Sequence, residues 1–468
     1  MSSLTSIEQL KACFALQQQA FAAQPYPSLT ERQAQLKALQ QALIEHEQAL
    51  LAAIDQDFSG RSAHESRIAD LFSSLQAIKH SRKHLASWMR AERRAVDLIF
   101  WPARNYIQYQ PKGVVGIIVP WNYPVQLAIA PLQAALAAGN RVMLKLSEYT
   151  PATNAVLSTL LGKCFAQDQV AVVEGDQQMG AAFAELPWDH LFFTGSTSVG
   201  RKVMQAAAAN LTPVTLELGG KSPALLAADA NLEQAAKRLC FAKSLNAGQT
   251  CIAPDYVLLP EDKINDFVQA YQRTFSQFYP DLANNADYSA IINSAQYQRL
   301  KSWLDEAEQQ GAMLHSMSES KLPGRRLAPV LVSQCPEHCQ LMQQEIFGPW
   351  LPLVGYQSVD QALDYVRQRP RPLALYLFTD QDELRQQVLQ TSHAGGVCVN
   401  DAILQVAQED LPFGGVGPSG MGNYHGRDGF LCFSHAKAVH QRYRLSGNAM
   451  LYPPYPNWLP RVLRALMR

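Results

Sequence analysis

The chain has 468 residues, of which 47% are hydrophobic and 17% charged, and its 40 basic side chains balance 40 acidic ones. This composition excludes a wholly disordered chain and argues against a nucleic-acid binder that works through a basic surface. A chain of this length forms two or three domains and buries a sizeable core without disulfides or structural metal.

Eight cysteines are scattered along the chain, which is typical of a protein from a reducing compartment and not of a disulfide scaffold. Cys335 and Cys339 have a spacing seen in zinc sites, but no second pair of Cys or His lies nearby, so we expect no metal. Residues 1–8 lack the features of a signal peptide, and no window reaches about 18 apolar residues. We therefore expect a cytoplasmic protein.

Residues 1–100 are predicted to be helical and contain no residue pattern that points to chemistry. Ser28 and Glu31 have the spacing of a capping box, which predicts that a helix begins there. Four leucines are expected to share one buried helical face: Leu36, Leu39, Leu43 and Leu50.

From residue 113, short strands rich in β-branched residues alternate with alanine-rich helices. Strands are predicted over 113–119, 141–146, 170–173, 190–194 and 213–217, and helices over 125–138, 150–165, 181–186 and 198–209. This alternation predicts an α/β fold with a parallel, doubly wound sheet. Ligands of such sheets bind beyond the carboxyl ends of the strands, so the short turns there are the place to look for a site.

A second α/β region follows over about 219–430. Its strands are predicted over 256–259, 330–332, 351–356, 374–378 and 396–399, and its glycine-rich segment 411–426 is predicted to be an ordered loop without a regular element.

The segment 193–200 follows a predicted strand, opens a helix and contains Gly195, Ser196 and Gly200. A phosphate binds at such a turn, on free backbone N–H groups at the positive end of the helix dipole. The spacing is neither that of GxGxxG nor that of a P-loop, so a plain tight turn is an equal alternative.

Three side chains have the chemistry of a catalytic site, and each also has a structural interpretation. Cys251, in a polar stretch that contains glycine, is either an activated nucleophile or a small buried hydrophobe. Glu217, at the end of a strand, is either a general base or a surface partner of Lys221. Asn122 either donates its amide to a developing oxyanion or caps the helix that follows.

Seven motifs occur in the order found in the aldehyde dehydrogenase superfamily, which the chain resembles from about residue 30 to residue 445. Residues 251–256 and 421–426 resemble the class 3 branch, which includes fatty and aromatic aldehyde dehydrogenases and the bacterial coniferyl aldehyde dehydrogenases. The motifs are Pro120-Trp-Asn-Tyr-Pro124, Lys145-Leu-Ser-Glu148, Phe193-Thr-Gly-Ser-Thr197, Glu217-Leu-Gly-Gly-Lys221, Gly248-Gln-Thr-Cys251, Glu345-Ile-Phe-Gly-Pro349 and Pro412-Phe-Gly-Gly415.

The resemblance implies the NAD(P)-dependent oxidation of an aldehyde, either aromatic and phenylpropanoid or medium- to long-chain aliphatic, to the carboxylic acid. It makes Cys251 the nucleophile that adds to the aldehyde carbon, with Asn122 and the backbone N–H of Cys251 holding the oxyanion. Hydride then passes to the nicotinamide, and Glu217 activates the water that hydrolyses the resulting thioester.

The implied cofactor is NAD or NADP, and the resemblance does not choose between them. Leu146 stands where the family usually has proline, which frees the backbone φ angle there and leaves the role of Lys145 intact. The residues that the resemblance assigns to the cofactor are Trp121, Lys145, Glu148, Gly195, Ser196, Gly200, Glu345 and Phe347.

The implied aldehyde dehydrogenase-like fold has N-terminal helices and a cofactor-binding domain over 1–100 and 113–218, and a catalytic domain over 219–430. The segments 101–112 and 434–452 resemble the family's oligomerisation strands and imply a homodimer, with an ordinary edge hairpin as the alternative. The tail 453–468 predicts a short basic amphipathic helix. That helix lies on a subunit partner, frays in solvent or makes weak contact with a membrane surface.

Three other functions fit parts of the sequence. A CoA-acylating relative would resolve the thioester with CoA in place of water, and Glu217 speaks against it. A non-catalytic binding or structural protein on the same fold would be expected to lack Cys251 or Glu217, and both are present. A cysteine hydrolase that pairs Cys251 with a histidine would leave the phosphate turn without a purpose.

Overall fold

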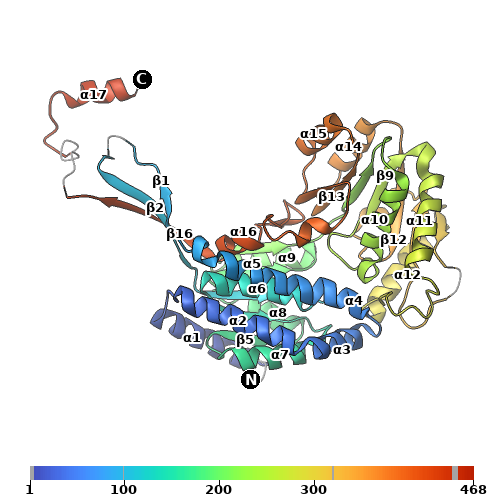
Figure 1. Ribbon diagram of the computed structural model, residues 1–468, viewed down its shortest axis with the longest axis horizontal. Helices are drawn as coiled ribbons and strands as arrows, with labels where there is room; N and C mark the ends of the chain where they lie inside the picture. Colours follow the sequence, from blue (N-terminus) through green and yellow to red (C-terminus); the bar gives the residue numbers. More distant parts are fainter. Residues whose placement is uncertain (1–4, 98–99, 319–320, 445–451, 468) are drawn as a thin grey trace.

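The computed structural model describes residues 5–97, 100–318, 321–444 and 452–467. Figure 1 shows a lower lobe built on one sheet, an upper lobe on the right built on a second sheet, and an arm that projects at the upper left. Both lobes layer helices against a mostly parallel sheet, so the predicted α/β fold is confirmed.

Six strands form the first sheet, in the order β15-β7-β6-β3-β4-β5. The chain leaves β3 toward β4 and β5 on one side and returns to β6 and β7 on the other, so the sheet is doubly wound as predicted. The strands are β3 (Val114–Ile118), β4 (Arg141–Lys145), β5 (Val170–Val173), β6 (His190–Thr194), β7 (Val214–Glu217) and the antiparallel β15 (Gly420–Met421).

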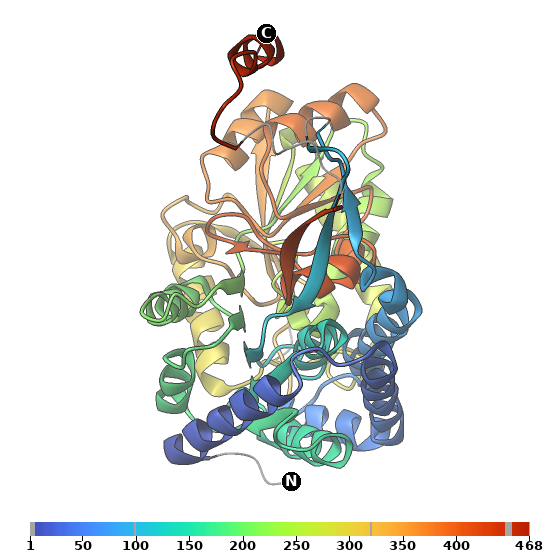
Figure 2. The ribbon, with the colours of Figure 1, turned by 90° about the vertical axis from the view of Figure 1, so that its left-hand side faces the viewer.

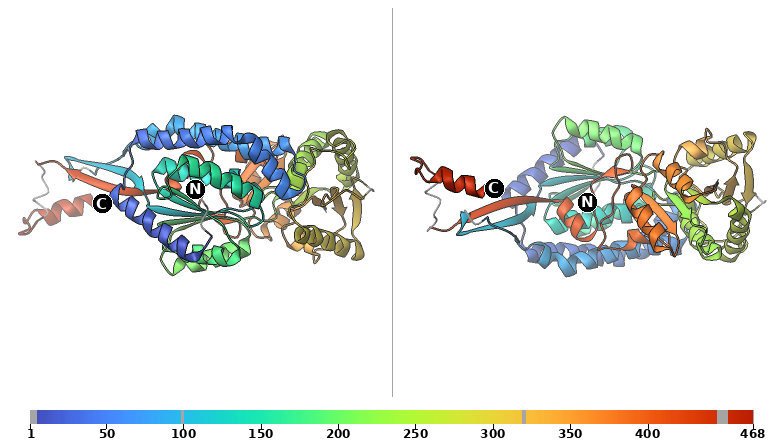
Figure 3. Two further views of the ribbon diagram at one scale, coloured as in Figure 1. Left: turned by 90° about the horizontal axis from the view of Figure 1, so that it is seen from below. Right: turned by 90° about the horizontal axis from the view of Figure 1, so that it is seen from above.

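Helices cover both faces of this sheet, as the two views of Figure 3 show. One face packs against α6 (Gln126–Ala138) and α7 (Pro151–Cys164), with N-terminal helices outside them. The other face packs against α1 (Ile7–Ala23), α8 (Gln177–Ala184) and α9 (Thr197–Ala208). Because the strands are buried on both faces, they read as continuous apolar runs in the sequence.

The N-terminal region is helical as predicted, and the capping box of Ser28 and Glu31 opens its second helix. The four leucines are all buried, but Leu50 belongs to a different helix from the other three because the chain breaks at His46. The helices are α2 (Leu29–Glu45), α3 (Glu47–Phe58), α4 (Ala63–Ser66), the π-helical η1 (Arg67–Phe72) and α5 (Ser73–Trp88).

Seven strands form the second sheet, in the order β10-β11-β12-β9-β8-β13-β14, with only β10 antiparallel in this described sheet. The strands are β8 (Pro223–Leu226), β9 (Tyr256–Pro260), β10 (Met313–Ser316), β11 (Val330–Ser333), β12 (Trp350–Tyr356), β13 (Ala374–Phe378) and β14 (Gly396–Val399). The longer helices around it are α10 (Leu232–Ser244), α11 (Ile264–Phe278), α12 (Ser294–Gln309), α14 (Val359–Arg367) and α15 (Asp382–Thr391).

Two short strands in the second lobe were not predicted. β8 begins with Pro223, and a proline argues against a strand when the sequence is read alone. The proline is tolerated here because it is the first residue of the strand. β10 is short, half-exposed and at the edge of the sheet, and only two of its four residues are apolar, so it lacks the signal of a buried strand. The predicted loop 411–426 also contains β15, whose Gly420 pairs with Glu217 of the first sheet.

The arm is a three-stranded antiparallel sheet of β1 (Glu92–Arg94), β2 (Ala103–Pro111) and β16 (Ser434–Arg442). Figure 2, which turns the arm toward the viewer, shows β2 and β16 side by side although they are far apart in the sequence. β1 lies inside the region predicted to be helical, where the run Glu-Arg-Arg has no apolar periodicity. Residues 445–451 of the predicted oligomerisation segment lie outside the described residues.

Beyond the arm, the tail forms the predicted short helix, α17 (Leu459–Leu466). The side chain of Leu466 and residue Arg468 lie outside what the structure describes. Among the described residues, no helix is both long enough and apolar enough to cross a membrane.

Candidate active site

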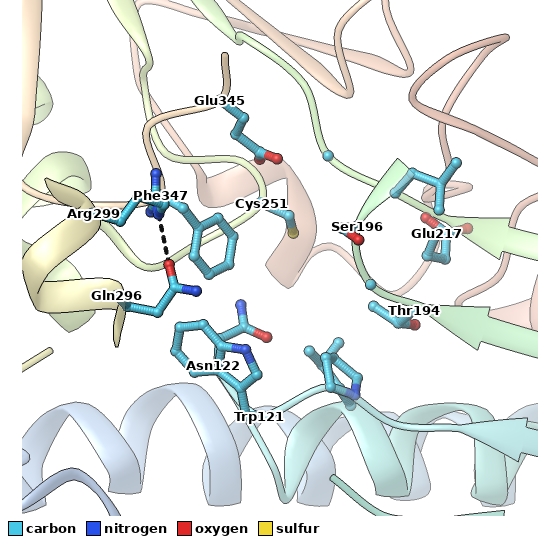
Figure 4. Close-up of a pocket in the computed structure, with 15 residues that line it drawn as sticks. Trp121, Asn122, Thr194, Ser196, Glu217, Cys251, Gln296, Arg299, Glu345 and Phe347 are labelled. Carbon is cyan, nitrogen blue, oxygen red and sulfur yellow. Dashed lines mark hydrogen bonds between the residues drawn. The ribbon is translucent and has the colours of Figure 1, made fainter. Parts of the chain in front are cut away.

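A cavity of about 240 Å³ lies at the carboxyl ends of the first sheet's strands, between the two lobes (Figure 4). This is where a doubly wound sheet binds its ligands. Eight of the eleven predicted site residues line it. The lining residues are Pro120, Trp121, Asn122, Leu127, Thr194, Gly195, Ser196, Glu217, Leu218, Gly219, Cys251, Gln296, Arg299, Glu345 and Phe347.

The three residues predicted to be catalytic come from three separate segments. Asn122 follows β3, Glu217 is the last residue of β7, and Cys251 follows α10 and the short turn η3 (Leu245–Gly248). Figure 4 shows all three around the same cavity. By contrast, Cys432 does not line the cavity: its Sγ lies 3.2 Å from Thr215 Oγ1 and 3.7 Å from His190 Nε2.

The segment before Cys251 is held in a strained conformation. Asn246 and Ala247 both have φ of 50°, a left-handed conformation that costs energy in residues other than glycine. The Gln249 side chain fixes the turn, because its Nε2 donates to the carbonyl oxygens of Asn246 at 2.9 Å and Ala290 at 3.0 Å, and its Oε1 accepts from Ile292 N. The turn therefore holds the Cys251 thiol in a fixed position.

The Asn122 side chain is buried and oriented by one hydrogen bond. Its Nδ2 donates to Gln249 O at 3.1 Å, which leaves the second N–H of the amide for a ligand. The alternative that Asn122 caps the next helix is wrong, because the first two N–H groups of that turn, at Val125 and Gln126, donate to Asp70 Oδ1 at 3.1 Å each.

Glu217 is only 2% exposed, and neither of its carboxylate oxygens has a hydrogen-bond partner among the described residues. Burial raises the pKa of this carboxyl well above its usual value. The alternative that it pairs with Lys221 at the surface is also wrong, since Lys221 donates to Asp255 instead. A buried carboxyl without a partner is costly, so it points to a functional role.

Burial and the nearby Glu345 and Glu217 carboxyls raise the pKa of the Cys251 thiol to about 12. Backbone N–H groups of Cys251 and Ile252 oppose this shift by stabilising the thiolate. Near neutral pH this raised pKa favours the protonated thiol, and its proton must leave when it reacts.

The side of the cavity near Glu345 fits a cofactor. Gly219 lets the carboxyl approach the chain, because a Cβ there would lie 2.2 Å from Glu345 Oε2. Burial and the nearby Asp255 raise the pKa of Glu345 to about 8. Phe347 has φ of 50°, and its ring lies 5.4 Å from the Trp121 ring in an edge-on arrangement.

Several buried polar atoms in the lining lack partners in the described part of the chain, and they form a set that a bound polar molecule would satisfy. They are Thr194 Oγ1, both Glu217 oxygens and Glu345 Oε1. Ser196 caps α9 by accepting from Val199 N at 3.4 Å, which places a helix N-terminus beside the cavity. Such an N-terminus favours a pyrophosphate.

Three predicted cofactor residues do not line the cavity. Lys145 folds back on its own loop, where its Nζ donates to Leu146 O at 2.8 Å and lies 3.8 Å from Glu148 Oε2. Gly200 packs inside the first helical turn, where a Cβ would lie 2.6 Å from a Leu218 methyl group. The glycine therefore permits close packing of α9 on the sheet.

Gln296 and Arg299 reach the cavity from α12 and were not predicted from the sequence. Arg299 donates to Gln296 Oε1 at 2.7 Å and to the carbonyl of Ile346 at 2.8 Å, and its guanidinium lies 4.3 Å from the Trp303 ring centre. It thus holds the backbone between Glu345 and Phe347. Arg299 stands in no recognisable sequence motif. It is far from the other site residues in the sequence, and only the fold brings it close to them.

Comparison with known proteins supports one family. Residues 3–439 match the aldehyde dehydrogenase family. The chain is 52% identical to a probable coniferyl aldehyde dehydrogenase of Pseudomonas aeruginosa, over 99% of this chain and 97% of the relative. It is 39% identical to aldehyde dehydrogenase family 3 member H1 of Arabidopsis thaliana, over 93% and 90%.

A solved structure gives the same result. The structure described as the substrate-bound state of Staphylococcus aureus AldH superposes with a TM-score of 0.92 at 37% identity, covering 98% of this chain and 99% of that one. The predicted activity and cofactor class are confirmed: the chain is an oxidoreductase that acts on the aldehyde group with NAD or NADP. It belongs to the aldehyde dehydrogenase family and resembles the class 3 branch.

Proposed function

We propose that this enzyme oxidises aromatic aldehydes of the coniferyl type to the carboxylic acid, with Cys251 as nucleophile, Asn122 as oxyanion donor and Glu217 as general base. The observation that carries the residue roles is the meeting of a thiol, a free amide N–H and an unpartnered buried carboxyl around one cavity. The 52% identity to a probable coniferyl aldehyde dehydrogenase supports the substrate class, with medium- and long-chain aliphatic aldehydes as the alternative.

An aldehyde carbon cannot release hydride until it becomes tetrahedral, so a nucleophile must add first. The Cys251 thiol gives its proton to water and its sulfur forms a bond to this carbon, while the C=O π electrons move onto the oxygen. The second N–H of the Asn122 amide and the Cys251 backbone N–H stabilise that oxygen as it becomes negative. A nicotinamide ring, when bound, would accept the hydride, and Cys251 then holds the acyl group as a thioester. Glu217 then takes a proton from water, whose oxygen displaces the thiol and gives the acid.

The chain's own residues fit the cofactor. We propose that Glu345 and Gln296 bind hydroxyl groups, that Phe347 and Trp121 form an apolar wall, and that the cap of α9 at Ser196 faces the pyrophosphate. Arg299 adds a positive charge to the lining, which suits a dinucleotide phosphate. Lys145 and Glu148, which pair with each other beside the site, are proposed to shape its edge.

Absorbance at 340 nm tests this function directly. The protein is mixed with NAD or NADP and with short aliphatic, long aliphatic, benzaldehyde-type and cinnamaldehyde-type substrates. We expect the highest kcat/KM for the cinnamaldehyde type. A higher value for long aliphatic aldehydes would overturn the substrate class, and turnover only with added CoA would favour a CoA-acylating enzyme.

We also propose a homodimer built through the arm. The arm stands away from both lobes, and the second sheet has an edge strand, β14, whose residues are all half-exposed and carry no neighbour on one side among the described strands. An apolar open edge invites pairing. We propose that the arm of one copy covers the edge of the other.

Sedimentation equilibrium measures the assembly. We expect twice the chain mass of 51.9 kDa. A substitution of Val397 by lysine on β14 is expected to shift the population toward the single chain, and a wild-type mass of one chain would contradict the dimer.

We propose that the tail helix α17 also lies on the second copy of the chain in the homodimer. Leu459 is buried, but Val462, Leu463 and Met467 are exposed on or next to this helix, and Arg461 and Arg464 alternate with them in the sequence. Weak contact with an anionic membrane surface is the alternative, and binding to anionic vesicles in a flotation assay would favour it.

We propose a cytoplasmic location, which suits eight free cysteines.

A further inference from the structure

A buried ion pair from the N-terminal helices holds the backbone of the loop that carries Asn122. Arg61 lies just before α4 and Asp70 lies in η1, and their side chains are 0% exposed. Arg61 Nη2 is 3.3 Å from Asp70 Oδ2. Neither residue lines the cavity, and nothing in their sequence neighbourhood resembles a catalytic motif.

Each member of the pair bonds to a different end of the loop. Arg61 Nη1 donates to the carbonyl oxygen of Asn122 at 2.6 Å, and Asp70 Oδ1 accepts from the N–H groups of Val125 and Gln126 at 3.1 Å each. Val125 occupies the N-cap position of α6 and has no polar side chain, so Asp70 supplies the cap that this helix needs.

The guanidinium of Arg61 is itself fixed by two rings. Its Cζ lies 4.7 Å from the ring centre of Phe58 and 4.8 Å from that of Tyr123. The Tyr123 hydroxyl in turn lies 2.6 Å from Thr250 Oγ1, next to Cys251. The contacts therefore run from the N-terminal helices through the Asn122 loop to the nucleophile turn.

The Asn122 carbonyl has a second donor. Asn246 Nδ2 reaches it at 3.0 Å, and Asn246 N donates to the buried Glu65 at 3.1 Å. Two donors on one carbonyl fix the peptide plane, and the direction of the Asn122 side chain follows from that plane. A shift of about 1 Å in such a group lowers a rate by about 100-fold.

We propose that Arg61 and Asp70 are positioning residues that aim the Asn122 amide at the developing oxyanion. This rests on the proposed role of Asn122. A pair that only stabilised the fold would not need to bond to both ends of this one loop, and it would lower activity independently of Asn122.

A double-mutant cycle separates the two roles. The pair is removed together, as Arg61→Gln with Asp70→Asn, because loss of one member would leave a buried charge without its partner. We expect kcat to fall by about 10- to 100-fold. Asn122→Ala is expected to lower kcat by about 100- to 1,000-fold. With all three substitutions, kcat should stay within about twofold of Asn122→Ala alone, because the pair acts through that amide.

The matched control is the exposed ion pair Arg67–Glu47, at 2.8 Å on the same stretch of chain. Its replacement by two glutamines should leave kcat within about twofold, since exposed pairs contribute little. Arg61→Lys keeps the charge beside Asp70 and guards against a variant that does not fold. It should still lower kcat by about threefold or more, because an ammonium does not reproduce the planar fork.

Two outcomes of these kinetic measurements would contradict the positioning role, and a third would contradict the role of Asn122. If the effects of the pair and of Asn122→Ala multiply, or if folded Arg61→Lys keeps the wild-type kcat, the positioning role is wrong. If Asn122→Ala itself keeps the wild-type kcat, the oxyanion role of Asn122 fails first, and the proposed mechanism must change.

Discussion

Replacing Cys251 by alanine is expected to abolish aldehyde oxidation, with kcat/KM lower by at least about 10⁴-fold. The reason is that hydride transfer needs a tetrahedral adduct, and the lining of the cavity contains one thiol. The rate of NAD(P)H formation at 340 nm measures this. Cofactor binding, followed by quenching of tryptophan fluorescence, should be retained because the cofactor residues are untouched.

Cys432→Ala is the matched control for this substitution. Its sulfur contacts Thr215 and His190 and does not line the cavity, so the variant should keep at least about half of the activity. Wild-type activity in Cys251→Ala, or loss of activity in Cys432→Ala with the fold intact, would contradict the assignment of the nucleophile.

The titration of the thiol gives a second measure of the same assignment. Since burial and two carboxyls raise the pKa of Cys251 to about 12, only a small fraction is thiolate near neutral pH. The rate at which iodoacetamide alkylates Cys251 in the free enzyme should therefore rise about tenfold per pH unit between about pH 7 and pH 9. A rate that is flat over this range would mean that the thiolate is already formed.

The strands predicted most accurately are those that form continuous apolar runs in the sequence. The strands over 170–173, 190–194, 374–378 and 396–399 lie where the apolar runs placed them, since each run is bounded by residues that end a strand. β8 was not predicted because it begins with a proline, and β1 was not predicted because it consists of three charged residues. The domain boundaries remain a prediction, and the chain returns at β15 from the second region to the first sheet.

In the site, the motif residues were predictable and their supports were not. Cys251, Glu217 and Asn122 stand in recognisable patterns, and the resemblance gave them roles. Arg299 and Asp70 have no such pattern, because their contacts with the site form only when α12 and η1 pack against it. The resemblance assigned Lys145 to the cofactor, but in the structure its ammonium bonds to its own loop.

Replacing Glu217 by glutamine is expected to stop the reaction after one turnover. Glutamine keeps the shape of the side chain but cannot take a proton from water, and general base catalysis contributes about 10²- to 10⁴-fold. The variant should release about one NAD(P)H per site in a burst and then turn over at that lower rate, with the acyl group bound to Cys251 and visible in the mass of the intact protein.

The pH dependence of thioester hydrolysis tests the proposed role of Glu217 as the base. Only the ionised carboxyl accepts a proton, and burial raises its pKa well above the usual value. Thioester hydrolysis in the wild type should therefore accelerate as the pH rises through that raised pKa, and the variant should lose this dependence. Glu345→Gln is the matched control, because it changes another buried carboxyl of the same cavity and should weaken cofactor binding without causing the acyl group to accumulate. If Glu217→Gln turned over at the wild-type rate once CoA was added, water would not be the natural acceptor, and the chain would be a CoA-acylating enzyme.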